Sequence, residues 1–116
     1  MSNTLGPGKQ LLINQSLISG DGMFKLILQS DGNLVLYQSG NIARWHTHTN
    51  GSSVSRAIMQ TDGNFVIYSP SNKVVWHTNT YGHPGAYLTL QNDGNIVIYW
   101  QPPRPSMKAL WNTGAL

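Results

Sequence analysis

The chain has 116 residues, of which 40% are hydrophobic, 9% are charged and none is cysteine. This composition predicts one folded domain with an apolar core, and it excludes a disulfide framework and any thiol-based catalytic or metal site. The net charge of +3 reflects seven scattered basic residues against four acidic ones. They form no basic cluster of the kind that typifies proteins that bind nucleic acid, so we expect no nucleic-acid partner.

The beginning of the chain predicts short, loosely organised elements. Residues 1–8 read as a lead-in that ends in the turn signal Gly6-Pro7-Gly8, and the apolar run at 9–13 suits a short strand. The N-terminal residues lack the basic and apolar regions of a secretory signal, and no apolar run approaches the roughly 20 residues that span a bilayer. We therefore expect a cytoplasmic or non-classically secreted protein without membrane insertion.

A nine-residue motif organises the rest of the chain. Gln-Ser-Asp-Gly-Asn-Leu-Val-Leu-Tyr at 29–37 returns at 60–68 and at 91–99, with a constant spacing of 31 residues. A fixed period of this size indicates one supersecondary unit built several times. The six positions that are identical in all three copies are Gln, Asp, Gly, Asn, Val and Tyr, whereas the large apolar positions vary. Because folding alone tolerates exchanges of apolar residues, a fixed polar set points to a ligand.

Strand parity predicts the hairpin that each motif forms. A loop of residues 30–32, closed by a glycine in a left-handed conformation, pairs Gln29 with Asn33 and leaves Val35 and Tyr37 on the same face as this pair. The apolar residues then point to the opposite, inward face. These inward residues are Leu26, Leu28, Leu34 and Leu36 in the first unit, Ala57, Met59, Phe65 and Ile67 in the second, and Leu88, Leu90, Ile96 and Ile98 in the third.

A tryptophan follows each motif on a further predicted strand. Trp45 and Trp76 follow their motifs closely, whereas Trp111 is delayed by an inserted loop at 101–105. Because an indole buries a large apolar area, we expect the three to pack together in the core. Trp100 lies outside the repeat, and it either forms an exposed contact or covers a sheet edge.

The pattern as a whole predicts an all-β protein. No window has a helical period, and turn residues recur at strand-length spacing. We predict a single domain over 1–116, built from three repeats at approximately 16–46, 47–77 and 78–113, with about four short strands each. Three such units can bury their inward rows together around a shared centre.

Two interpretations of the fixed polar set remain open at this point. Asp-Gly-Asn is a turn sequence, so the aspartate and asparagine can serve the backbone alone. That structural interpretation leaves the glutamine, valine and tyrosine without a reason to be fixed. A carboxylate, two amides, a phenol and a small apolar side chain together suit an uncharged ligand with adjacent hydroxyls and a ring of C–H groups, which describes a sugar.

The motif Gln-x-Asp-x-Asn-x-Val-x-Tyr resembles the signature of the monocot mannose-binding lectins, also called bulb-type or snowdrop-type lectins, whose domain is the B-lectin domain. All three copies match it in full, and the units cover nearly the whole chain. The resemblance implies a β-prism II fold, in which three four-stranded antiparallel sheets surround a pseudo-threefold axis. It also implies multivalent binding of α-D-mannose and mannose-containing glycans, with no metal and no other cofactor.

The resemblance also implies a role for each fixed side chain. The aspartate and asparagine would bind the axial O2 of mannose, the glutamine O3 and the tyrosine O4, while the valine would pack on ring carbons. The mannose-binding residues expected on this basis are Gln29, Asp31, Asn33, Val35 and Tyr37, then Gln60, Asp62, Asn64, Val66 and Tyr68, then Gln91, Asp93, Asn95, Val97 and Tyr99.

The chain departs from the family pattern in some respects. Plant members usually carry a disulfide and a signal peptide, and this sequence has neither. Many members dimerise by exchanging C-terminal strands. Residues 107–114 are the candidate strand for such a homodimer here.

Other functions are less well supported by the residues. Each copy of the motif offers one carboxylate, whereas glycosidases need two in one site, so we expect no enzyme. His46-x-His48 and His77 lack a clear third ligand for zinc, so we expect them to lie at a polar strand edge. The main alternative is a β-prism that binds proteins and not sugars, and the three intact polar sets favour the lectin over it.

Overall fold

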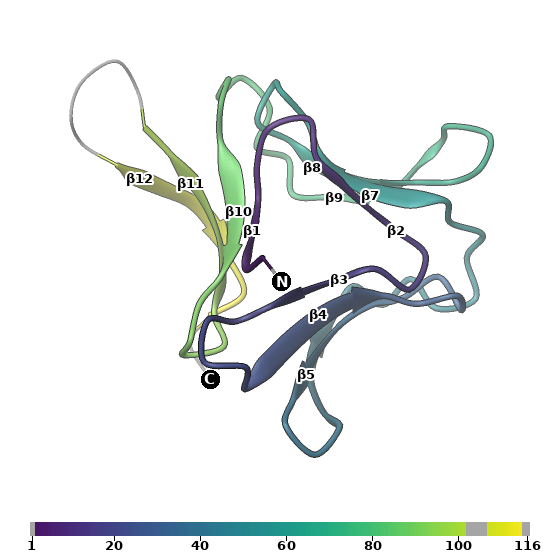
Figure 1. Cartoon of the computed structure of the whole chain (residues 1–116). Coiled ribbons are helices and arrows are strands. Elements are labelled where there is room, and N and C mark those ends of the chain that lie inside the picture. The colour runs from purple at the N-terminus through teal and green to yellow at the C-terminus, as the bar shows by residue number, and fades with distance from the viewer. Residues whose placement is uncertain (1, 102–106, 115–116) are drawn as a thin grey trace.

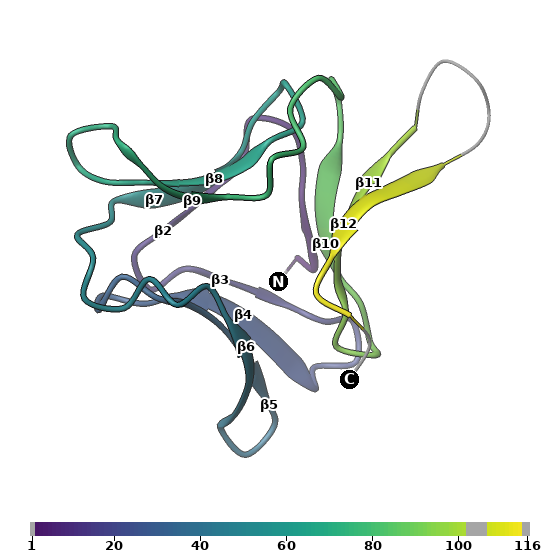
Figure 2. The same cartoon turned by 180° about the vertical axis from the view of Figure 1, so that it is seen from behind.

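The computed structural model describes residues 2–101 and 107–114, and within them the chain forms three four-stranded antiparallel sheets. Figures 1 and 2 show the sheets surrounding one central axis like the sides of a triangular prism. The described residues include no helix long and apolar enough to cross a membrane. The three sheets, in spatial order, consist of β3 (Ser16–Ile18), β4 (Phe24–Leu28), β5 (Leu34–Gln38) and β6 (Ile42–His46); of β2 (Gln10–Leu12), β7 (Arg56–Met59), β8 (Phe65–Tyr68) and β9 (Val74–His77); and of β1 (Thr4–Leu5), β10 (Tyr87–Leu90), β11 (Ile96–Trp100) and β12 (Lys108–Asn112).

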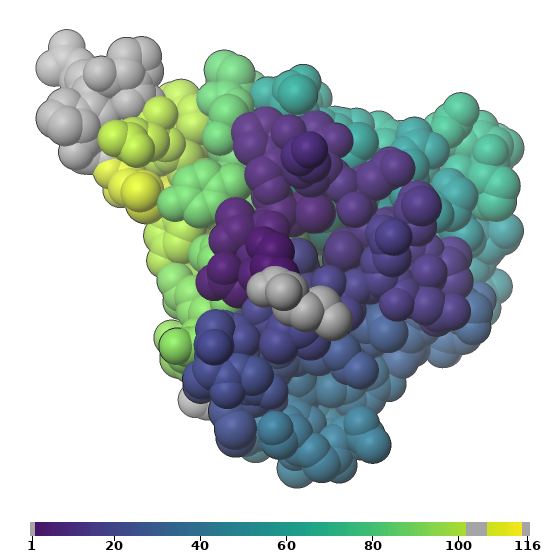
Figure 3. Space-filling view, viewed as in Figure 1, coloured from purple at the N-terminus to yellow at the C-terminus, as the bar shows by residue number. Residues whose placement is uncertain are grey.

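The N-terminal segment joins the three sheets together. It supplies the first strand of each: β1 pairs with β10, β2 with β7 and β3 with β4. The expectation of a loose lead-in over 1–8 is therefore wrong for its described part, because Thr4 and Leu5 pair with Thr89 and Leu88, and Leu5 is buried. Figure 3 shows the whole N-terminal segment, in purple, lying across one end of the prism.

The predicted hairpin register is confirmed in all three units. Ile27 pairs with Val35, and the Gln29 N–H donates to the Asn33 carbonyl at 2.9 Å, so the loop contains three residues. The equivalent bonds recur in the other two hairpins at the same 2.9 Å. All twelve side chains predicted to point inward are at most 1% exposed. The apolar rows therefore meet in one core, as strand alternation requires.

The tryptophans of the three units pack against one another as expected. The rings of Trp45, Trp76 and Trp111 have centroids 5.8–6.0 Å apart and interplanar angles of 71–75°, the edge-to-face geometry that aromatic pairs favour. Trp100 contacts the loop that precedes β10: its indole N–H donates to the Pro84 carbonyl at 3.1 Å, and its ring packs edge-on against His83 at 4.8 Å. The inserted loop predicted at 101–105 lies outside the described residues beyond Gln101.

Candidate functional site

Each repeat places its polar set on the outer face of one hairpin, away from the core. The first site lies on β4–β5, the second on β7–β8 and the third on β10–β11. Within each hairpin the fold brings all five predicted side chains to one face and its loop. It does not bring the three sets together, because each sheet faces outward in a different direction (Figures 1 and 2).

The loop of the first hairpin holds Asp31 at its tip. The Gly32 N–H donates to the Gln29 carbonyl at 3.1 Å, and Gly32 has a φ of 93°, which favours glycine. A Cβ at Gly32 would also overlap the carbonyl oxygen of Ser52 in the following loop. The glycine of the motif is therefore required by the fold, and it brings the aspartate to an exposed position.

The aspartate serves the turn with only one of its oxygens. The Asp31 Oδ1 accepts the Asn33 N–H at 2.9 Å, and the second and third units repeat this bond at 2.9 Å. The structural interpretation of this residue is thus correct for one oxygen atom. The other carboxylate oxygen of each exposed aspartate remains able to accept a bond from a ligand.

Threonines that follow each tryptophan hold the asparagine amide. The Asn33 Oδ1 accepts the Thr47 hydroxyl at 3.3 Å and the Thr49 N–H at 3.2 Å, and its Nδ2 faces the His46 Nδ1 at 3.0 Å. The second unit repeats this arrangement with Thr78, Thr80 and His77 around Asn64. Because the amide oxygen is occupied and one amide hydrogen faces the histidine, the second amide hydrogen is the part of the asparagine that can face a ligand.

These threonines are not among the predicted site residues, although the sequence carries a signal for them. Each tryptophan is followed two residues later by Thr47, Thr78 or Thr113, so the threonine is as constant as the motif itself. The third unit differs at the neighbouring positions, where Asn112 replaces the histidine and residue 115 is alanine. Asn95 is accordingly less buried than its two equivalents, and its Oδ1 accepts the Thr113 hydroxyl at 3.3 Å.

The glutamine and tyrosine of each set meet across the hairpin. The Gln29 Nε2 donates to the Tyr37 hydroxyl at 2.5 Å, and hydrogen bonds also join Gln91 to Tyr99 and the corresponding pair of the second unit. In the second unit, the Gln60 amide bonds both Asp62 and Tyr68. Its nitrogen faces the two Asp62 carboxylate oxygens at 3.1 and 3.2 Å, and its oxygen accepts the Tyr68 hydroxyl. In the second unit the carboxylate, amide and phenol therefore form one continuous polar row.

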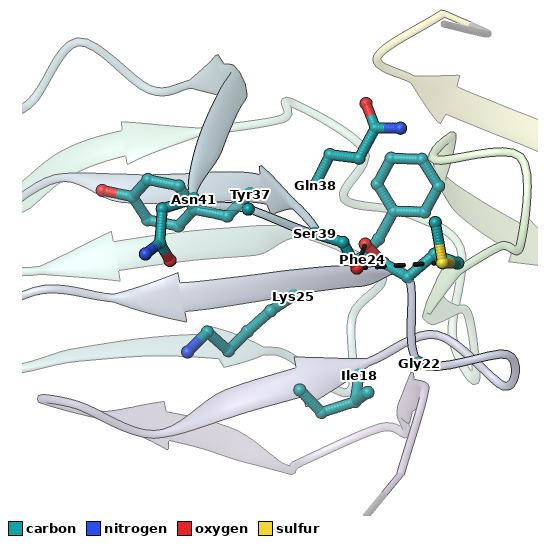
Figure 4. A pocket seen from close by; sticks show the side chains of 10 residues that line it. Ile18, Gly22, Phe24, Lys25, Tyr37, Gln38, Ser39 and Asn41 are labelled. Carbon is teal, nitrogen blue, oxygen red and sulfur yellow. Dashed lines mark hydrogen bonds between the residues drawn. The ribbon is translucent and has the colours of Figure 1, made fainter.

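The valine of each set lies between the polar groups but is largely covered. Val35, Val66 and Val97 are 4%, 1% and 3% exposed, so a ligand meets only the edge of each side chain. The polar rows are open surfaces, not enclosed cavities. A groove of about 240 Å³ reaches only the first site, at Tyr37, and extends away from Asp31 past Lys25 and Asn41 (Figure 4).

The histidines belong to the supports of the first two sites. His46 and His77 contact the asparagine amides, and His48 packs against His46 with ring centroids 3.9 Å apart. Among residues 2–101 and 107–114, no group of three or more metal-binding side chains gathers in one place. The position of His46 and His77 beside the amides matches their expected place at a polar strand edge.

Solved structures of known lectins resemble this chain closely, whereas no family model and no curated protein matches it. A structure described as Japanese Marasmius oreades lectin aligns with a TM-score of 0.88 and 33% identity, over 99% of this chain and 92% of that one. Monomeric monocot mannose-binding lectin from Gastrodia elata aligns at 0.84 and 41%, over 97% of both chains. The mannose-specific agglutinin from snowdrop (Galanthus nivalis) bulbs, complexed with methyl α-D-mannoside, aligns at 0.80 and 42%, over 97% and 96%.

These alignments confirm the predicted all-β, β-prism II fold, since they cover nearly the full length of each chain. Identities of 41% and 42% over that length show a relationship closer than a shared fold. The motif, the three-sheet architecture and these relatives agree. The chain belongs to the monocot mannose-binding lectin family.

Proposed function

We propose that this protein is a lectin that binds α-D-mannose and mannose-containing glycans at up to three sites per chain, without a metal ion. The observation that carries the proposal is the recurrence of one polar set, in the same local geometry, on the outer faces of three sheets. The relatives support it, since two are described as mannose-binding or mannose-specific and one was solved with methyl α-D-mannoside. Lectins bind sugars without converting them, and membership of this family supports the prediction that the chain is not an enzyme.

The hydrogen bonds within each set determine what it offers to a sugar. In the first site, Asp31 keeps one oxygen as an acceptor, and Asn33 keeps as a donor the amide hydrogen that does not face the His46 ring. A sugar hydroxyl both donates and accepts, so this pair suits a single hydroxyl, which the family resemblance identifies as O2. Gln29 and Tyr37 are already joined, and they present their remaining donor and acceptor capacity to the next hydroxyls, O3 and O4.

The strength of one site follows from the size of this set. Four or five hydrogen bonds at about 0.5–1.5 kcal/mol each, less the cost of immobilising the ligand, leave a dissociation constant on the order of millimolar. One site with a millimolar dissociation constant binds a glycan only weakly. Three sites on one rigid body can bind a clustered or branched glycan display far more tightly through effective concentration.

Affinity chromatography tests the proposal directly. The protein should be retained on immobilised mannose, elute with free methyl α-mannoside and stay bound in EDTA. Flow-through at low salt would refute mannose binding and would favour the alternative, a β-prism that binds proteins. If the protein is retained, the stoichiometry of methyl α-mannoside binding measured by calorimetry should approach three sugars per chain.

Paired substitutions at the aspartate separate ligand binding from turn formation. Asp31→Asn keeps a side-chain oxygen for the Asn33 N–H but removes the negative charge and one carboxylate acceptor, whereas Asp31→Ala removes both functions. We expect Asp31→Asn to fold normally and to lose the first site. If Asp31→Asn binds as strongly as the original protein at that site, the aspartate serves only the turn.

Dimerisation through the C-terminal strand stays a prediction of the family resemblance. β12 pairs with β11 of its own chain, so exchange would transfer this pairing to the β11 of a second molecule. Light scattering distinguishes a monomer of 12.8 kDa from a dimer of twice that mass.

A further inference from the structure

The three sites share their polar set but differ in the side chain beside each site tyrosine. Directly paired residues of an antiparallel sheet point to the same face with their Cβ atoms about 5 Å apart, so the partner of the tyrosine lies at the edge of the site. That partner is basic in two sites and aromatic in the third. The pairs are Lys25 with Tyr37, Arg56 with Tyr68, and Tyr87 with Tyr99.

In the first site, Lys25 and Tyr37 line the same groove. The lysine is exposed, and its amine extends to the same side as the tyrosine hydroxyl (Figure 4). The groove, of about 240 Å³, continues from this pair to Asn41 and Ser39, and so leaves room for a substituent that projects beyond the tyrosine. A flexible ammonium at its edge is a mobile donor that can follow such a substituent.

In the second site, the arginine is held in place by two contacts. The Arg56 guanidinium carbon lies 4.7 Å from the centre of the Tyr68 ring, and its Nη1 donates to the Asn72 Oδ1 at 3.0 Å. A guanidinium has five N–H donors in a rigid plane, so most of them stay available for an anion after this bond. The stack fixes the cation at the edge of the site before any ligand arrives.

The third site is uncharged at the same position. The Tyr87 ring lies 6.0 Å from the Tyr99 ring, and its hydroxyl contacts the Met107 sulfur at 3.4 Å. Lys108, in the same sheet, pairs with Trp100. It therefore points to the face opposite Tyr99, since successive strand residues alternate.

We propose that the first and second sites select mannose residues carrying an anionic ester, phosphate or sulfate, on O6, and that the third site selects neutral mannose. The inference rests on the proposed function, in which the tyrosine binds O4. C6 is attached to C5, the ring carbon next to C4, so an ester on O6 leaves the ring beside the tyrosine. The residue paired with the tyrosine on the neighbouring strand, Lys25 in the first site and Arg56 in the second, places a positive charge beside this ester.

Site-resolved NMR titration tests this selection. One valine lies in each site, so the methyl signals of Val35, Val66 and Val97 report three affinities from a single sample. Methyl α-mannoside, its 6-phosphate and its 6-sulfate are titrated separately. We expect both esters to bind the first two sites about twofold to fivefold tighter than the neutral sugar, with the gain falling as salt is added, and the third site to show no gain. Esters that gain equally at all three sites, or at none, would overturn the proposal.

Variants of the edge residue give a second, independent test. Lys25→Gln should remove the ester gain at the first site, whereas Lys73→Gln, which removes an exposed lysine from the turn before β9, should leave it intact. Tyr87→Lys should give the third site a preference for esters. Retention of the gain in Lys25→Gln contradicts the proposal. If methyl α-mannoside itself shifts no valine signal, the proposed function fails instead, and inorganic phosphate that matches the esters in affinity would show anion attraction without sugar selection.

Discussion

Replacing Thr49 with valine tests whether the threonines behind each site hold its geometry. The Thr49 side chain is buried, and its hydroxyl donates to the Gly32 carbonyl at 2.6 Å and lies 2.7 Å from the Thr47 hydroxyl. Valine keeps the branched shape and the backbone N–H that supports Asn33. The substitution therefore removes two hydrogen bonds and leaves the Gly32 carbonyl buried without its side-chain donor.

The expected loss of stability follows from these two bonds. At about 0.5–1.5 kcal/mol each, their removal lowers the free energy of unfolding by about 1–3 kcal/mol. Unfolding entropy of about 2.1 cal/mol/K per residue gives about 0.24 kcal/mol/K for a chain of 116 residues. The Tm of Thr49→Val should therefore fall by about 4–12 °C.

Circular dichroism melting and valine methyl titration measure the two consequences. The matched control is Thr61→Val, which makes the same chemical change at an exposed position and should shift the free energy of unfolding by less than about 0.5 kcal/mol. We also expect Thr49→Val to weaken mannose binding at the first site and to leave the second and third unchanged. A Tm within 1–2 °C of the original protein, on the order of the control, would refute the supporting role of this hydroxyl.

Two further substitutions probe the loops. In urea titration, Gly63→Ala should lower the free energy of unfolding by about 2–5 kcal/mol, because the φ of Gly63 is 96° and a Cβ there would lie 2.9 Å from the Thr80 carbonyl oxygen. Gly51 has a φ of 86° but open space around it, so Gly51→Ala should lower the same free energy by only about 1–2 kcal/mol. Hydrogen bonds from a backbone N–H and from the Ser19 hydroxyl lower the pKa of the Asp21 carboxyl. Asp21 therefore stabilises the fold above its unfolded pKa of about 3.9 and loses this effect as the pH falls through the lower folded value, so the urea midpoints of Asp21→Asn and the original protein should differ at pH 7 and converge near pH 2.

Much of the architecture could be predicted from periodicity and parity. The constant spacing of the motif and the alternation of strand side chains predict the three-residue loop and every inward residue, because a shift of one residue would expose all of the apolar positions. The partners of β1 and β2 could not be predicted in this way. Strands of two or three residues carry no pattern that selects one sheet over another, and both join sheets whose other strands lie more than forty residues further along the chain.

The grouping of each polar set on one face of its hairpin was predictable, but the hydrogen bonds within the set were not. The motif indicates that Asp31 and Asn33 serve either the turn or a ligand. In the structure, one Asp31 oxygen accepts a bond within the turn, and the Asn33 amide oxygen accepts the Thr47 hydroxyl. The threonine partners escape a motif search because they lie just beyond the end of the next strand, 14 residues after the first two asparagines and 18 after the third. Only the fold brings them behind the amide.

Sharing of the core explains why the apolar positions vary among repeats and the polar positions do not. The second unit pairs a small Ala57 with Ile67 and a large Met59 with Phe65, where the first unit uses four leucines. Because the three sheets fill one core, volume missing at one position can be supplied by a neighbour or by another sheet. The outer faces have no such exchange, since each site meets its ligand alone. A polar set that lost one member could not borrow it from a site that faces another direction.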